Sequence, residues 1–158
     1  MTARGAAAPG NPLHRLADAV PGTAAGYVSI VARVLGAAAA LYYAYDQDQL
    51  FPTDHFPRTW AFVIVVAAIA IASTIPLRGR FAPWLAALGC GVLVFAGAIL
   101  SHQAPGIVVL VAGVVAWVAF AIANHQRGGS IGAAVSGLFM GSLLSFLLVG
   151  AIVLAIEG

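Results

Sequence analysis

The residues best suited to metal or acid–base chemistry crowd one short stretch of the sequence. This stretch contains Asp46, Asp48, Asp54 and His55. Carboxylates combined with an imidazole can bind a divalent cation. However, the Asp-x-Asp spacing lacks the central glycine and the closing bidentate glutamate of a calcium loop. We therefore expect a solvated acidic rim and assign no metal ligand.

Arg33 is a different kind of candidate, because it stands inside a long apolar run. A central arginine in a membrane helix costs about 2.5–3.5 kcal/mol on insertion scales. In one interpretation its guanidinium contacts an anion or an acidic group of a partner subunit. In the other, the side chain bends back toward the cytoplasmic headgroups. The sequence leaves both open.

The remaining reactive side chains do not form a catalytic or cofactor-binding pattern. The histidines are His14, His55, His102 and His125, and all fall in predicted loops or at predicted helix ends. A b-type haem between helices would need axial ligands at membrane depth. There is no His-Glu-x-x-His motif, and the arginines are too scattered for nucleic-acid binding. We expect a protein that is not an enzyme and binds no cofactor, metal or nucleic acid.

The composition identifies the class of protein. Of 158 residues, 62% are hydrophobic and 8% charged, and the mean hydropathy is +1.01. A soluble domain carries about 25% charged residues. The expected fold is an all-α membrane protein. A membrane-spanning helix needs about 20 apolar residues, and five stretches of the chain qualify or nearly do: 26–45, 60–77, 82–101, 106–124 and 131–156.

The arginines predict the orientation of these five spans. One side of the predicted membrane holds Arg4, Arg15, Arg78, Arg80 and Arg127, and the other holds only Arg58. Short arginine-rich loops stay in the cytoplasm. We therefore expect a multi-pass protein of the bacterial cytoplasmic (inner) membrane, with the N-terminus inside and the C-terminus outside.

The first 25 residues read as a cytoplasmic tail outside the transmembrane domain of 26–158. Apolar residues recur at helical spacing over 12–20, after Asn11 and Pro12, which could cap and begin a helix. This pattern suggests a short helix on the membrane surface. A flexible lead-in fits the same residues.

Small residues recur every four positions in two of the spans. One series is Ala32, Gly36, Ala40 and Ala44, and the other is Ala133, Gly137, Gly141 and Ser145. Such stripes let helix backbones approach closely in a membrane. They could serve packing within the chain, or Gly137 and Gly141 could contact a partner.

The outer end of the second predicted span reads Phe56–Pro57–Arg58. This motif, following an alanine-rich first span, resembles the small membrane subunit of tripartite tricarboxylate transporters. Pro52–Thr53–Asp54–His55 stands where that family has a Gly-Pro-Gly-like lead-in. The resemblance implies a small accessory subunit beside a larger membrane subunit that carries the ion-coupled carboxylate path. It also implies a solute-binding protein outside. Arg33, Phe56, Pro57 and Arg58 would then be partner-contact residues.

Two other functions remain open. One is an accessory subunit of a respiratory or other energy-transducing membrane complex. The other is a self-assembling channel or holin-like protein, which should line its path with polar residues. The polar residues available in the spans are few: Ser73, Thr74, Ser136, Ser142 and Ser145.

Overall fold

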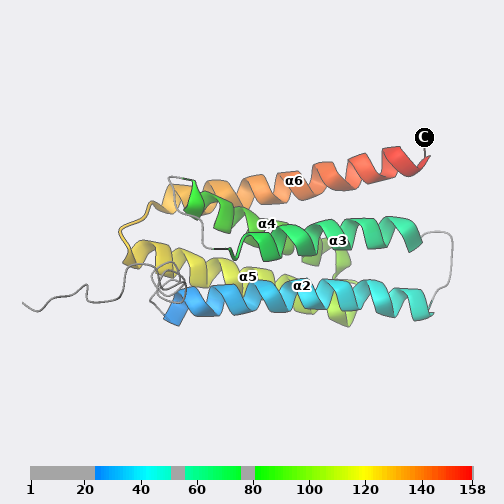
Figure 1. The fold of residues 1–158 in the computed structure, drawn as a ribbon, viewed down its shortest axis with the longest axis horizontal. Coiled ribbons are helices and arrows are strands. Elements are labelled where there is room, and N and C mark those ends of the chain that lie inside the picture. The colour runs from blue at the N-terminus through cyan, green and yellow to red at the C-terminus, as the bar shows by residue number, and fades with distance from the viewer. Residues whose placement is uncertain (1–23, 51–55, 76–80, 158) are drawn as a thin grey trace, which may run out of the picture.

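The computed structural model describes residues 24–50, 56–75 and 81–157. These residues form only helices, namely α2 (Ala24–Leu50), α3 (Phe56–Ala72), α4 (Ala82–Leu100), α5 (Ala104–Gln126) and α6 (Ile131–Glu157). They run alternately up and down in one elongated bundle (Figure 1). The all-helical fold class is confirmed. The predicted surface helix over 12–20 lies outside the described residues.

Four of the helices are long and apolar enough to cross a membrane, namely α2, α4, α5 and α6. The exception is α3, with 17 residues. At 1.5 Å per residue it extends about 25 Å, less than the roughly 30 Å hydrocarbon core. In Figure 1 its C-terminal end stops short of the ends of its neighbours.

The bounds of α3 differ from the predicted span of 60–77 at both ends. The helix begins earlier, at Phe56, with Pro57 in its first turn, where a missing N–H is tolerated. It ends earlier because Ser73 and Thr74 turn their hydroxyls back onto the carbonyls of Ala70 and Ile71, each at 2.6 Å. Ile75 precedes a proline, and this position disfavours helical geometry.

The other helix boundaries follow local sequence signals. Pro83 and Pro105 stand in the first turns of α4 and α5, where a missing N–H is tolerated. At the end of α5, Gly128 adopts a positive φ of 75°. The Gly128 N–H bonds the carbonyl of His125, and the Gly129 N–H bonds that of Asn124. This pair of bonds is a Schellman motif, which stops the helix and turns the chain toward α6.

Both series of small residues pack against other helices of the same chain. Gly137 and Gly141 are buried against α4. A Cβ added at Gly141 would collide with the backbone carbonyl oxygen of Leu88, and Gly91 of α4 meets the carbonyl of Leu138 in the same way. On α2, Ala40 and Ala44 are buried in the core. The stripes therefore set close helix–helix contacts inside this bundle.

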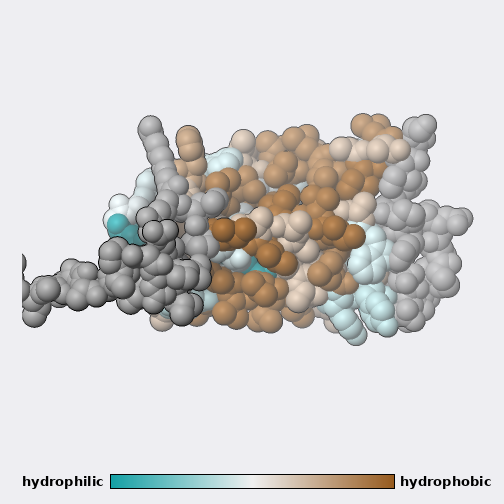
Figure 2. Space-filling model, viewed as in Figure 1, coloured by the Kyte–Doolittle hydropathy of each residue, from teal (hydrophilic) through white to brown (hydrophobic). Residues whose placement is uncertain are grey.

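Large apolar side chains cover the outside of the bundle. Figure 2 shows hydrophobic residues over the middle of the visible face and more hydrophilic ones toward its ends. The last helix is the least enclosed, since 11% of its most apolar stretch is buried, against 50% for α4. The surface is suited to a hydrocarbon environment, so the described residues form a membrane protein with transmembrane helices.

The glycine contacts predict opposite effects for one substitution at two positions of α6. Gly→Ala normally favours a helix by about 1 kcal/mol. We expect that gain at Gly150, where nothing lies within 4 Å of an added Cβ. At Gly141 we expect a loss of about 1–3 kcal/mol from overpacking against Leu88. Thermal unfolding in mild detergent should give a lower midpoint for Gly141→Ala and an equal or higher one for Gly150→Ala. Equal behaviour would contradict the close α4–α6 contact.

Candidate functional site

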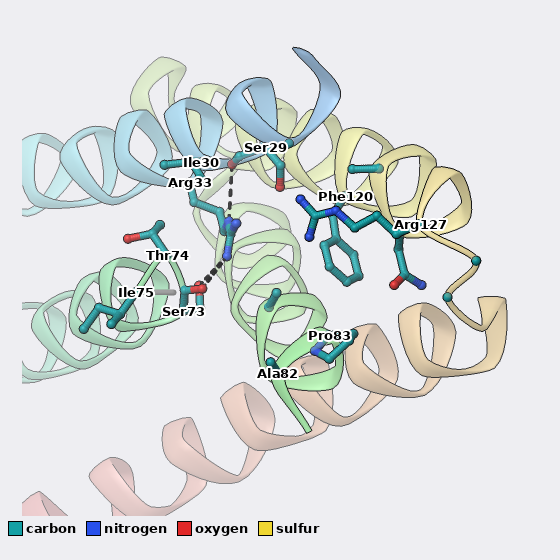
Figure 3. Close-up of a pocket in the computed structure, with 16 residues that line it drawn as sticks. Ser29, Ile30, Arg33, Ser73, Thr74, Ile75, Ala82, Pro83, Phe120 and Arg127 are labelled. Atoms are coloured by element: carbon teal, nitrogen blue, oxygen red, sulfur yellow. Dashed lines mark hydrogen bonds between the residues drawn. The ribbon is translucent and has the colours of Figure 1, made fainter. Parts of the chain in front are cut away.

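A candidate site is a cavity of about 320 Å³ at the end of the bundle where α2, α4 and α6 begin. Its walls come from the first turns of α2 and α4, the turn that follows α3, and the end of α5 (Figure 3). Ser73, Thr74 and Ile75, which follow the end of α3, contribute to the lining.

Arg33 projects from α2 into this region and is 4% exposed. Its Nη1 donates to the carbonyl oxygen of Ser73 at 2.6 Å and to Ser73 Oγ at 3.1 Å. Its Nε donates to the carbonyl oxygen of Ser29, one turn earlier on α2, at 3.3 Å. The last carbonyls of a helix have no partner within that helix. Arg33 therefore caps the C-terminus of α3 from a neighbouring helix, and a cation suits that negative end.

The structure places the Arg33 guanidinium inside the bundle. The side chain bends toward the N-terminal end of α2, as a snorkelling arginine would. Its guanidinium ends among protein carbonyls and a hydroxyl (Figure 3) and is not exposed at the surface. The end of α3 therefore supplies acceptors for the guanidinium within the chain.

A second arginine reaches the same cavity. Arg127 is the C-cap of α5 and is exposed. Figure 3 shows its guanidinium reaching from the end of α5 toward the side of the cavity that carries Arg33. Among the described residues, its side chain makes no hydrogen bond or ion pair. The cavity therefore has one arginine held in place and one able to adjust.

Buried polar contacts hold the walls of the cavity together. Ser29 Oγ donates to the carbonyl oxygen of Ala116 at 2.8 Å, which joins α2 to α5. Asn124 Nδ2 donates to the carbonyl oxygen of Ser130 at 3.0 Å, which fixes the turn that carries Arg127. Apolar side chains complete the lining, among them Ile30, Ile75, Pro83 and Phe120. None of the described residues that line the cavity is acidic.

The other predicted partner-contact residues lie elsewhere. Phe56, Pro57 and Arg58 form the first turn of α3, at the opposite end of the bundle, and their side chains are outside the described part. Gly137 and Gly141 face α4. Of the groups that sequence reasoning missed, Ser29 carried a usable signal, since it stands four residues before Arg33 and shares its helix face. Ser73 and Asn124 carried no comparable signal.

Sequence reasoning also missed one motif. Gly128–Gly132 has the Gly-x-Ser-x-Gly spacing of a hydrolase nucleophile elbow, which requires a turn from a strand into a helix. Here the segment joins two helices. Ser130 Oγ accepts a hydrogen bond from the Gly132 N–H at 3.1 Å and so caps the start of α6. The serine acts as a helix cap.

The acidic and imidazole groups show no metal-binding arrangement within the described part. No group of three His, Cys, Asp or Glu side chains there could hold a metal ion. At the end of the bundle opposite to the cavity, the Tyr43 hydroxyl and His102 Nε2 lie 2.8 Å apart and join α2 to the end of α4. Asp54 and His55 lie outside the described residues.

No protein-family model, curated protein or solved structure gave a match to this chain. The resemblance to the tripartite transporter subunit therefore depends on the residues quoted for it alone.

Because Arg33 caps the end of α3, removing its guanidinium should lower the stability of the protein. Arg33→Leu leaves the backbone carbonyl of Ser73 without its donor, at a cost of about 1–3 kcal/mol for a buried unsatisfied group. We expect a clearly lower unfolding midpoint in detergent. Ser73→Ala is the control, since it removes the hydroxyl but keeps the carbonyl and should cost less. An Arg33→Leu variant as stable as wild type would contradict the cap and favour a snorkelled side chain.

Proposed function

We propose that this chain is a small non-catalytic binding subunit of the bacterial cytoplasmic membrane that recognises an anion in the Arg33–Arg127 cavity. The observation that carries the proposal is that two guanidinium groups face one cavity with no acidic residue among its described lining. A charge in a low-dielectric site is unfavourable unless it is compensated. An anion between the arginines would supply that compensation.

The donors at the cavity suit an anion with several oxygen atoms. Guanidinium groups present pairs of N–H donors that match carboxylate and phosphate oxygens. Asn124, whose Nδ2 also donates to the carbonyl of Ser130, adds an amide to the same lining. A single halide ion could not use this many donors at once.

The anion site is testable with a matched pair of variants. In neutral detergent we expect at least one anion from a panel of phosphate, citrate and anionic lipid to raise the unfolding midpoint of the wild type. Arg127→Gln should reduce that shift, because an exposed arginine can be removed without loss of the α3 cap. Arg58→Gln, at the other end of α3, should keep it. The proposal fails if no anion shifts the unfolding midpoint of Arg58→Gln more than that of Arg127→Gln.

The same proposal includes five membrane crossings with the cavity on the cytoplasmic side. The alternating helices put the start of α2 and the turns after α3 and α5 at one end of the bundle (Figure 1). The sequence places five of its seven arginines in the segments that belong to that end. Arginine-rich ends stay in the cytoplasm, so the N-terminus is inside and the C-terminus outside.

Single cysteines at the two ends would test the orientation. Ser130 is exposed beside the cavity end, and Ser101 lies at the other end of α4. In a Cys90→Ala background, a membrane-impermeant thiol reagent added to intact cells should label Ser101→Cys and spare Ser130→Cys. Labelling of both positions after cell lysis provides the control. The reverse pattern would invert the proposed orientation.

The subunit role is supported by the Phe56–Pro57–Arg58 resemblance and by the exposed surface of α6. The resemblance implies a larger transport subunit as the partner and a solute-binding protein outside. Since little of α6 is enclosed by its own chain, a large apolar surface remains for lipid or a neighbouring membrane protein. The first turn of α3, at the outer end, would dock against the larger subunit.

Co-purification in mild detergent would test the subunit role. Phe56→Ala combined with Arg58→Ala should reduce recovery of a large membrane partner while this chain stays folded and inserted. Arg127→Gln, at the opposite end, should leave recovery unchanged. If the double variant keeps its partner and only loses stability, the motif serves to begin α3 and does not contact a partner. A homo-oligomer without a partner would instead favour the self-assembling alternative.

A further inference from the structure

The cavity is lined by cationic and apolar side chains together, and this combination narrows the choice of anion. Arg33 and Arg127 are the cations, and Ile30, Ile75 and Phe120 form apolar parts of the wall beside them. We propose, building on the anion site above, that the cavity binds the phosphate headgroup of an anionic phospholipid. The glycerol and the first carbons of the acyl chains then lie against the apolar wall.

The first argument for a lipid is depth. The cavity is lined by the first three turns of α2, the first two turns of α4 and the last two turns of α5. These helix ends belong to the level of the headgroups in a membrane protein. Basic pockets between helices at this level bind the headgroups of anionic lipids.

The second argument is the size and edge of the cavity. Its volume of about 320 Å³ is at the lower end of the roughly 300–1,000 Å³ typical of ligand sites, and it exceeds what a bare phosphate ion needs. Ile75 lines the cavity and is also 57% exposed. An apolar residue at the rim gives acyl chains a continuous path from the headgroup to the hydrocarbon.

The third argument is the way the charges are held. Arg33 is fixed by Ser29 and Ser73, so it presents a positive charge at a constant position. Arg127 is exposed at the end of α5 and can close over a bound phosphate. Among the acidic residues on described helices, Asp46, Asp48 and Glu157 lie at the far ends of α2 and α6. These helix ends lie at the end of the bundle opposite to the cavity (Figure 1).

The test compares lipid with soluble phosphate on the whole protein. Purified in neutral detergent, the wild type is mixed with phosphatidylglycerol, phosphatidylcholine, glycerol 3-phosphate or inorganic phosphate. Bound lipid is counted by native mass spectrometry, and the unfolding midpoint is measured in parallel. We expect phosphatidylglycerol to bind and raise the midpoint, and the other three to have little effect. Arg127→Gln should weaken phosphatidylglycerol binding about tenfold, from the loss of one charge-assisted contact, whereas Arg58→Gln should not.

A second variant tests the apolar wall. Phe120→Ser keeps both arginines but makes the wall polar, so it should weaken phosphatidylglycerol binding and leave any response to soluble phosphate unchanged. Equal shifts with glycerol 3-phosphate and phosphatidylglycerol would overturn the lipid inference and leave the anion site intact. Equal binding of phosphatidylglycerol and phosphatidylcholine would also overturn it. If every anion shifts the unfolding midpoint of Arg127→Gln as much as that of the wild type, both the lipid inference and the anion site fail.

Discussion

The bond from the Arg33 guanidinium to the carbonyl of Ser73 is the contact on which the cavity end of the bundle depends. A helix that ends inside an apolar environment leaves carbonyls that neither water nor its own backbone can satisfy. Here a neighbouring helix supplies the donor. A buried arginine therefore becomes acceptable, because the negative end of α3 compensates part of its charge. The carbonyls at the end of α3 gain a hydrogen-bond donor, and the buried guanidinium gains acceptors. Each group therefore offsets the desolvation cost of the other.

Close backbone packing makes this contact reachable. The side chain of Arg33 can meet Ser73 only because α2 and α3 lie near each other, and both helices contribute small buried residues to one core cluster, among them Ala37, Ala40 and Ala70. On the other side of the bundle, Gly91, Gly137 and Gly141 bring α4 and α6 into backbone contact. In hydrocarbon there is little hydrophobic drive between helices, so packing of this kind and interhelical hydrogen bonds hold the bundle together.

The end of α3 also borders the cavity, which Arg33 and Ser73 line together. The end of α5 then adds Arg127 through a Schellman turn that Gly128 permits. The feature that stabilises the fold and the feature that could bind a ligand thus share one residue. A ligand in the cavity would contact the α3 cap directly, so binding and stability should be coupled.

Much of this structure is local and could be read from the sequence. Hydropathy determined the helical membrane class, Pro83 and Pro105 marked two helix starts, and Gly128–Gly129 marked the break before α6, because these signals act on a few neighbouring residues. The arginine distribution likewise predicted an asymmetry between the two ends. The end of α3, the partners of Arg33 and the cavity were decided only by tertiary structure. Ser29, Ser73 and Asn124 belong to three different segments, and they meet through the packing register of the helices. No local sequence pattern determines which backbone carbonyl accepts a hydrogen bond from a buried guanidinium.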